Sequence, residues 1–155
     1  MKTTVTTLVF LTNEDKILLA IKKRGFAKGK YNGIGGKVEA NETIEQATVR
    51  ECEEEIGVTP EKYRQFATIT FHEFINGKLE EIIMHTFECN KWRGEPVESE
   101  EMTPEWFDKD KVPFENMLPD DKFWFPLFLA GKKFTAKFEF DENWKLLNHE
   151  IEEQR

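Results

Sequence analysis

The sequence has little of several features that mark specialised classes of protein. Its two cysteines, Cys52 and Cys89, are far apart and form no CxxC motif, which argues against a disulfide framework or a zinc site and fits a reducing compartment. Acidic residues outnumber basic ones by 30 to 22, so a broad surface for a nucleic-acid polymer is not expected. The apolar run at residues 8–11 is far too short to cross a bilayer, so no membrane partner is expected.

The apolar content is instead typical of a folded domain. Hydrophobic residues make up 39% of the 155 residues, with 14 Phe and 4 Trp among them, which excludes a disordered chain. No internal repeat, low-complexity segment or Pro/Ser/Gly linker divides the sequence. We therefore predict one domain over residues 1–155, working as a monomer in the cytoplasm.

The local patterns predict strands, helix, strands, helix and strands in that order. The first half predicts strands at 5–12 and 17–21 joined as a hairpin, a glycine-rich loop at 25–36, and a helix at 42–56 with Gly57 as its C-cap. The second half predicts paired strands at 66–75 and 79–89, a polar loop at 90–104, a helix from 119 to about 131, a strand at 134–140 and a last strand after Trp144. This order favours a mixed sheet with helices packed on it.

Charge is distributed unevenly between two adjacent segments. Residues 22–37 are basic and contain no acid, whereas residues 38–61 contain eight Glu. A charge run usually marks a solvated surface. However, at about 100° per residue Glu51, Glu54 and Glu55 share one face of the predicted helix. Three crowded carboxylates destabilise a helix unless a cation neutralises them, and their oxygens suit Mg²⁺ or Mn²⁺. The metal would in turn hold an anionic polyphosphate.

The same segment resembles a known sequence motif. Gly36-Lys-Val-Glu-Ala-Asn-Glu42, seven further residues and then Arg50-Glu-Cys-Glu-Glu-Glu-Ile-Gly-Val58 are similar to the Nudix box at every fixed position. Cys52 is a soft departure, because the family usually has an aliphatic residue there. The resemblance implies the Nudix fold, an α/β/α sandwich around a mixed β-sheet. It also implies Mg²⁺-dependent hydrolysis of a nucleoside diphosphate linked to another moiety.

The resemblance also implies roles for individual residues. The metal ligands would be the Gly36 carbonyl, Glu51, Glu54 and Glu55, with Glu101 nearby. Either Glu51 or Glu54 would activate the attacking water, and the sequence leaves that choice open. The residues expected to meet phosphate oxygens belong to the basic loop: Lys22, Gly35, Gly36 and Lys37.

Three longer segments resemble the animal members of the MutT-like subgroup, which hydrolyse oxidised purine nucleoside triphosphates. These segments are KKRGFAKGKYNGIGGKV, PVESEEMTPEWF and LPDDKFWFPLFL. The resemblance implies that Asn32, Asp120 and Asp121 read the purine. It implies less specifically that Thr7, Lys22 and Phe71 form the pocket wall.

The tandem Asp has two possible interpretations. An acidic pair after Pro119 is typical of a helix N-terminus. Two neighbouring carboxyl groups also resist joint ionisation, so one that keeps its proton gives the pair a donor and an acceptor for a purine edge. Leu118 stands where the subgroup has a Trp, which removes a stacking ring that Phe71 or Phe123 would have to replace.

These expectations favour an enzyme that hydrolyses oxidised purine nucleoside triphosphates such as 8-oxo-dGTP to a monophosphate and pyrophosphate, sanitising the nucleotide pool in support of DNA repair. Two alternatives stay open. One is a Nudix hydrolase of dinucleoside polyphosphates or capped RNA. The other is a non-catalytic nucleotide sensor, which the intact glutamate cluster of residues 51–55 disfavours.

Overall fold

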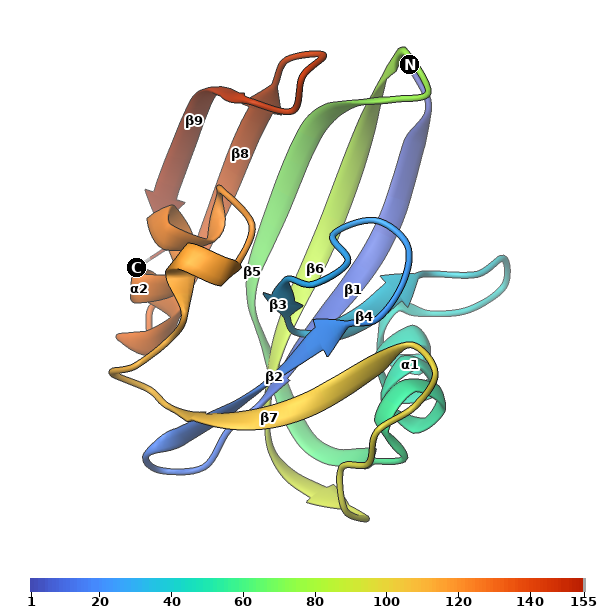
Figure 1. Cartoon of the computed structure of the whole chain (residues 1–155), viewed down its shortest axis with the longest axis vertical. Helices are drawn as coiled ribbons and strands as arrows, with labels where there is room; N and C mark the ends of the chain where they lie inside the picture. Colours follow the sequence, from blue (N-terminus) through green and yellow to red (C-terminus); the bar gives the residue numbers. More distant parts are fainter. Residues whose placement is uncertain (155) are drawn as a thin grey trace.

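Two β-sheets form the frame of the protein across residues 1–154, the part of the chain that the computed structural model describes. The larger sheet is mixed, in the order β4 (Ile34–Lys37), β1 (Thr3–Leu11), β6 (Lys78–Arg93), β5 (Thr59–Ile75), β8 (Phe134–Phe140) and β9 (Leu146–Glu153). The smaller sheet is antiparallel, in the order β3 (Tyr31–Asn32), β2 (Lys16–Lys22) and β7 (Met102–Asp108). Figure 1 shows them with helix α1 (Ile44–Ile56), the short 3-10 turn η1 (Phe114–Asn116) and helix α2 (Asp121–Leu129).

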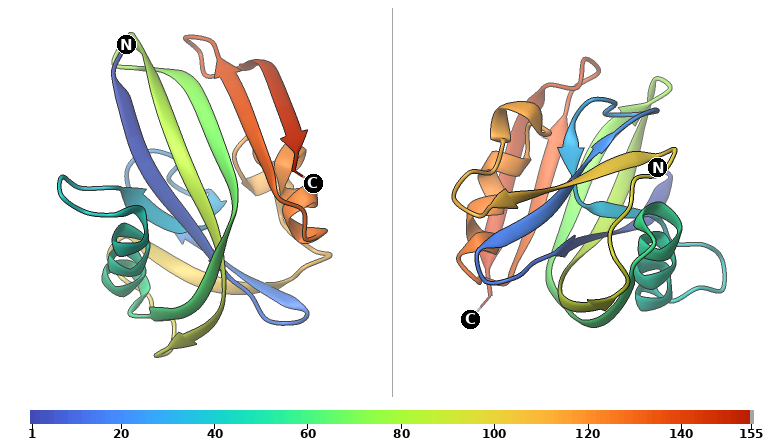
Figure 2. Two further views of the ribbon diagram at one scale, coloured as in Figure 1. Left: turned by 180° about the vertical axis from the view of Figure 1, so that it is seen from behind. Right: turned by 60° about the horizontal axis from the view of Figure 1, so that its bottom comes forward.

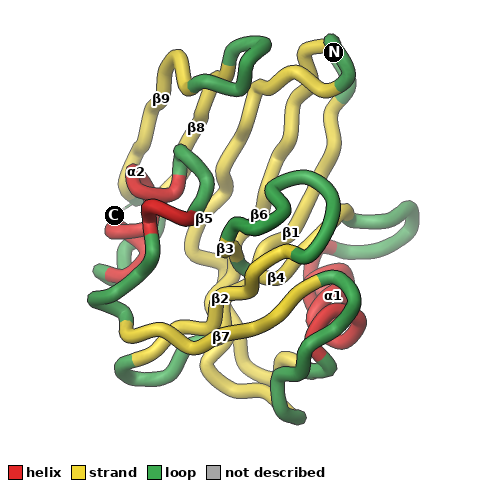
Figure 3. Tube along the Cα trace, viewed as in Figure 1, coloured by secondary structure: helices red, strands yellow, loops and turns green. Residues whose placement is uncertain are grey.

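The two helices cover different faces of the central strands, as Figures 2 and 3 show. Val9 of β1 belongs to the apolar cluster that contains Cys52 of α1, whereas Phe10 belongs to the cluster that contains Trp124 of α2. Successive side chains of a strand point to opposite faces, so β1 is buried on both sides. The predicted sandwich of helices around a mixed sheet is confirmed. None of the helices within residues 1–154 has the length and apolar character needed to cross a membrane.

Helix α1 ends at the predicted C-cap, Gly57, but it begins at Ile44, two residues after the predicted start, with Thr43 as its N-cap. The Gln46 N–H donates to Thr43 Oγ1 at 3.0 Å, and the Thr43 N–H donates to the Gln46 side chain at 2.9 Å. This capping box satisfies two backbone donors that the first turn leaves free. Gly57 ends the helix in the left-handed conformation, with φ at 71°. The caps fix the register in which the glutamates face one side and the apolar residues the other.

The predicted hairpin between the first two strands is wrong. A single bridge joins Thr12 to Ile17, after which β1 and β2 enter different sheets. Strand β1 pairs in parallel with β6 and antiparallel with β4. Apolar strands that follow one another suggest a hairpin, but both are buried on two faces here and find partners that are distant in sequence.

The predicted loops at 25–36 and 90–104 are also partly wrong, because they contain β3, most of β4 and the start of β7. A Cβ at Gly35 would lie 1.8 Å from the Thr7 carbonyl oxygen. Glycine therefore marks a close approach of two strands here instead of a flexible loop. Pro104 lies in β7, which pairs only with β2 and so forms an edge of the small sheet.

The other elements predicted for the second half are present, but their bounds differ: β5 begins at Thr59, β6 extends to Arg93 in the predicted loop, and α2 is shorter than predicted. Strands β5 and β6 form a long hairpin around Asn76 and Gly77, which both have positive φ. Helix α2 contains Pro126, strand β8 has the predicted bounds, and the residues after Trp144 form strand β9.

Candidate active site

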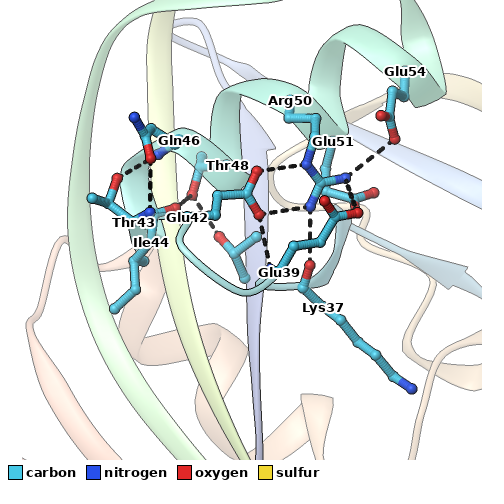
Figure 4. Close-up of polar contacts among 11 residues, drawn as sticks. Lys37, Glu39, Glu42, Thr43, Ile44, Gln46, Thr48, Arg50, Glu51 and Glu54 are labelled. Atoms are coloured by element: carbon cyan, nitrogen blue, oxygen red, sulfur yellow. Dashed lines mark hydrogen bonds and ion pairs between the residues drawn. The ribbon is translucent and has the colours of Figure 1, made fainter.

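The guanidinium of Arg50 organises the glutamates of α1 and of the loop before it (Figure 4). Its Nε and Nη2 donate to the two oxygens of Glu42 at 2.6 and 2.9 Å, and Nη2 also donates to the Lys37 carbonyl at 3.0 Å. Its Nη1 donates to Glu51 Oε1 at 2.9 Å and to Glu54 Oε2 at 3.2 Å. Hydrogen bonding to Arg50 lowers the pKa of Glu42 to about 2. One cation thus compensates several carboxylates and ties α1 to the end of β4.

Glu51 lies between α1 and β4. It is 8% exposed although it is ionisable. A Cβ at residue 36 would lie 2.6 Å from Glu51 Oε1, so this carboxylate occupies the space that any side chain at Gly36 would need. The structure therefore brings together two of the predicted metal-ligand residues, and a side chain at position 36 would displace the Glu51 carboxylate.

Glu55 carries the clearest sign that this cluster suits a cation. Its Oε2 is buried and has no hydrogen-bond partner among the described residues. Burial, followed by the hydrogen bond to Glu51 and its negative charge, raises the pKa of Glu55 to about 8. The negative charge of Glu101 adds to this rise and the positive charge of Lys22 opposes it. An unpaired buried carboxylate is costly unless a proton or a metal ion neutralises it.

Glu54 and Glu101 lie at the margin of this cluster. The Glu54 side chain is 60% exposed and turns toward Arg50. Glu101 accepts a hydrogen bond from Arg24 Nε at 3.0 Å, and this contact lowers the pKa of its carboxyl group. Lys23 of the same basic loop pairs with Glu98. The basic loop is therefore fastened to the acidic segment that precedes β7.

The carboxylate oxygens of this cluster suit a divalent cation, although Arg50 donates hydrogen bonds to two of the carboxylates. Among residues 1–154, no group of three His, Cys, Asp or Glu side chains stands close enough to hold a metal ion as drawn. The unpartnered Glu55 oxygen, beside Glu51 and Gly36, nevertheless provides hard oxygen ligands of the kind that Mg²⁺ and Mn²⁺ prefer.

A second candidate site is a cavity of about 120 Å³ on the face of the large sheet that packs against α2, opposite the face that packs against α1. Five of the predicted substrate-binding residues line it: Asn32, Phe71, Leu118, Asp120 and Asp121. Asn32 lies on β3 and Gly36 on β4, with Gly33 between the strands. A short connection therefore links this cavity to the glutamate cluster.

The aspartate pair lies at the start of α2, and each residue is 2% exposed. Asp120 is the N-cap residue but makes no capping hydrogen bond with its side chain. Its Oδ2 instead accepts from Trp124 Nε1 at 2.9 Å, and Asp121 Oδ2 accepts from the Leu118 N–H at 3.1 Å. Helix capping therefore does not explain Asp120.

Burial controls the protonation of this pair. It raises the pKa of Asp120 to about 6, although the hydrogen bond from Trp124 opposes the rise. Burial and then the negative charge of Asp120 raise the pKa of Asp121 well above its ordinary value. Both shifts favour the protonated form, so the pair holds a proton more readily than exposed aspartates do and can offer a donor as well as acceptors in this cavity.

Other predicted substrate residues lie elsewhere. Thr7 Oγ1 hydrogen-bonds Thr48 Oγ1 at 2.6 Å in the interface between β1 and α1, and Thr7 does not line the cavity. Lys22 is likewise absent from the cavity, and its positive charge acts on the pKa of Glu55. The Lys37 side chain extends away from Arg50 in Figure 4. Phe123 packs on His149, with ring centres 4.3 Å apart, instead of supplying a ring to the cavity.

Sequence reasoning missed more than half of the cavity wall. The missed residues are Phe26, Glu73, Ile82, Met84, Phe140 and Trp144. Phe71 pairs with Ile82 across β5 and β6 and with Phe138 across β5 and β8. These residues meet only because of strand register, which the sequence does not reveal. Only Trp144 could have been recognised from its local sequence, because it is an aromatic residue in an otherwise polar turn.

The fold and the site define an α/β protein with a carboxylate-rich helix beside an acidic, aromatic cavity. The NUDIX domain model matches residues 2–128, so the chain belongs to the Nudix family. It is 46% identical over 147 residues to the oxidized purine nucleoside triphosphate hydrolase of Danio rerio, covering 95% of this chain and 93% of that protein. The Mus musculus protein of the same name is 42% identical over 147 residues, which again cover 95% of this chain and 93% of that protein. The crystal structure of a MutT protein from Bacillus halodurans superposes with a TM-score of 0.84 at 28% identity, covering 96% of this chain and 97% of the other.

Proposed function

We propose that this Nudix hydrolase converts oxidised purine nucleoside triphosphates, such as 8-oxo-dGTP, to the nucleoside monophosphate and pyrophosphate. The observation that carries the proposal is the buried Asp120–Asp121 pair in a small aromatic cavity. An enzyme that read only phosphates would have no use for it. The similarity to the zebrafish and mouse hydrolases along nearly the whole chain supports the same substrate class. The activity would sanitise the nucleotide pool and so assist DNA repair.

We assign the divalent ion, Mg²⁺ or alternatively Mn²⁺, to Glu51, Glu54, Glu55 and the Gly36 carbonyl, with Glu101 at the margin. When bound, such an ion supplies Lewis-acid stabilisation of charge on phosphate oxygens. The unpartnered Glu55 oxygen and its raised pKa support this assignment. Arg50 is a positioning residue, because it holds Glu51 and the Lys37 carbonyl in place.

The general base is Glu51 or Glu54. Glu54 is the more exposed of the two and so can reach a water molecule directly. Glu51 is held by Arg50 against Gly36, which suits a fixed ligand better than a mobile base. Lys22 stands at the end of β2, its positive charge acts on Glu55, and it would contact phosphate oxygens that enter beside the ligands. The same phosphate oxygens would pass three residues of β4: Gly35, Gly36 and Lys37.

Base selection falls to Asp120, Asp121 and Asn32. The protonated and ionised carboxyl groups offer a donor and an acceptor to the purine edge, and the Asn32 amide offers both. The Asn32 Oδ1 accepts from the Gly33 N–H at 2.8 Å, which fixes the direction of the amide. Phe71 and Leu118 provide apolar wall.

The proposal is tested by product analysis with Mg²⁺ and a panel of 8-oxo-dGTP, dGTP, dTTP and a dinucleoside polyphosphate. We expect kcat/KM to be highest for 8-oxo-dGTP, with pyrophosphate as the product. Release of orthophosphate would contradict the reaction. A preference for the dinucleoside polyphosphate would favour the alternative substrate class.

We further propose that the protein acts as a monomer in the cytoplasm. Each of the two candidate sites is assembled from one chain, and Cys52 and Cys89 are free and buried, as expected in a reducing compartment. Light scattering during size-exclusion chromatography tests the first point. Localisation of a tagged chain tests the second.

A further inference from the structure

Trp144 adopts a backbone conformation that disfavours a bulky side chain. It lies in the turn between β8 and β9, with φ at +59°. Its N–H donates to the Asp141 carbonyl at 3.0 Å, and the Asp141 N–H donates to the Lys145 carbonyl at 2.9 Å. The Asp141 carboxylate accepts from the N–H groups of Asn143 and Lys145 at 2.8 and 2.9 Å. Glycine or asparagine normally occupies the left-handed position of such a turn, so turn chemistry does not explain a tryptophan.

Three neighbours hold the indole as a wall of the cavity. The Trp144 and Phe140 rings lie nearly parallel, at 11°, with centres 5.2 Å apart. The Phe26 ring meets the indole edge-on at 5.0 Å and 89°. The indole Nε1 donates to Glu73 Oε2 at 3.4 Å, which fixes the plane of the ring. All four side chains line the cavity that contains the aspartate pair.

The size of the cavity shows what kind of group this wall suits. A volume of about 120 Å³ is the space of roughly four water molecules, and ligand pockets for drug-sized molecules hold about 300–1,000 Å³. The cavity therefore suits a flat ring system, with the sugar and phosphates outside it. Aromatic side chains stack on any base, whereas carboxyl groups distinguish the edge of the base.

We infer that Trp144 is a base-binding residue that contacts the face of the purine and supplies the aromatic surface that Leu118 lacks. This inference rests on the proposed function and deepens it. Bulky residues that keep a left-handed conformation are concentrated at ligand clamps and active sites, where the surroundings maintain the strain. Here the Asp141 turn and the Phe26, Phe140 and Glu73 contacts maintain it.

The test measures binding of 8-oxo-dGMP to the full chain, with dTMP for comparison. Trp144→Asn suits the left-handed backbone but removes the ring. Stacking of one base on an aromatic ring is worth about 1–3 kcal/mol, so we expect the Kd for 8-oxo-dGMP to rise about 5- to 140-fold. Trp144→Phe restores a ring and should recover most of the affinity. The matched control is Trp106→Phe on β7, where Trp106 stacks on Trp92 at 5.9 Å and lies outside the cavity.

Tryptophan fluorescence provides a readout that a structural role would not change. Quenching by 8-oxo-dGMP should persist in Trp106→Phe and disappear in Trp144→Phe. An unchanged Kd in Trp144→Asn, with wild-type binding intact, would overturn the inference. Binding of 8-oxo-dGMP without hydrolysis of 8-oxo-dGTP would remove the proposed function and leave the role of Trp144 standing. Absence of purine binding in the wild type would remove both.

Discussion

Two groups of carboxyl side chains lie in this protein, and they are stabilised in opposite ways. On α1, Arg50 donates hydrogen bonds to Glu42, Glu51 and Glu54 and keeps that face charged. In the cavity that we propose binds the purine base (the base cavity), Asp120 and Asp121 accept hydrogen bonds from the Trp124 indole and the Leu118 N–H, which carry no charge. Burial then raises both aspartate pKa values. Carboxylates paired with the Arg50 guanidinium can instead bind a metal ion. A carboxyl pair that holds a proton can donate and accept hydrogen bonds at the edge of a base.

The largest expected effect comes from removing a carboxylate charge from α1, which should affect catalysis and leave the cavity unchanged. Glu51→Gln should lower kcat about 10²- to 10⁴-fold for every nucleotide, because it removes either a metal ligand or the general base. The Kd for 8-oxo-dGMP should stay near the wild-type value, since the cavity is untouched. Steady-state kinetics and a binding titration measure the two effects.

The matched control is Glu53→Gln. Glu53 lies on another face of α1, is exposed, and accepts from Thr59 Oγ1 at 2.8 Å. We expect near-normal kcat from it. Near-full kcat in both Glu51→Gln and Glu54→Gln would show that the catalytic assignment is wrong.

Removing the positive charge of Arg50 should lower the stability of the folded protein. Arg50→Met leaves Glu42 and Glu51 without their shared donor, and the Arg50 side chain is only 22% exposed. Breaking this half-buried ion pair from one side leaves two carboxylates without their donor, so Tm should fall by several degrees and by more than the loss of an exposed pair causes. Thermal melts without added metal measure it.

Arg64→Met is the corresponding surface control. Arg64 pairs with Glu88 at 2.7 Å but is 44% exposed, so we expect a loss of about 1 kcal/mol or less. Equal Tm losses in the two variants would show that Arg50 has no special role.

The base cavity should show its own pH dependence. The folded-state pKa of Asp120 is raised to about 6 from 3.8, so the folded protein binds its proton more tightly than the unfolded chain does. This contribution to stability is present at low pH and falls as pH rises from about 4 to about 6. The loss is about 2 kcal/mol, or ~4–8 °C in Tm.

The measurement compares the Tm–pH profiles of the wild type and Asp120→Asn. The difference between them should change over this interval, while Asp110→Asn, an exposed residue, should follow the wild type. A difference that is constant with pH would contradict a protonated aspartate pair.

The glutamate site could be predicted from the sequence because its geometry is local. Helix periodicity places Glu51, Glu54 and Glu55 on one face, and Gly36 lies just before that helix. The i,i+4 spacing likewise favours the Arg50–Glu54 pair. The contact between Arg50 and Glu42 was not predicted, because it depends on the loop that brings Glu42 across.

The base cavity could be predicted only in part. The acidic pair and Asn32 were recognisable, but Glu73 and Trp144 come from β5 and from the β8–β9 turn. Their meeting depends on which strands are neighbours in the sheet. The mistaken β1–β2 hairpin has the same cause, since local apolar patterns indicate strands without naming their partners.

The smallest effect is expected at residue 118. Leu118→Trp adds a ring to a cavity whose wall already contains Phe71 and Trp144. We expect the KM for 8-oxo-dGTP to fall about 5-fold, corresponding to ~1 kcal/mol of stacking, with a smaller change for dGTP. Leu147→Trp, at an exposed position of β9, is the control. If neither KM changes in Leu118→Trp, residue 118 does not contact the base.

The central claim is that catalysis and base selection depend on separate carboxyl groups. The most direct measurement compares kcat/KM for 8-oxo-dGTP, dGTP and dTTP in Glu51→Gln and Asp120→Asn. We predict that Glu51→Gln lowers all three values by a common factor. Asp120→Asn should lower the value for 8-oxo-dGTP about 10- to 100-fold more than that for dTTP, because it alters hydrogen bonds to the purine edge alone. An equal loss for all three nucleotides in Asp120→Asn would contradict the account.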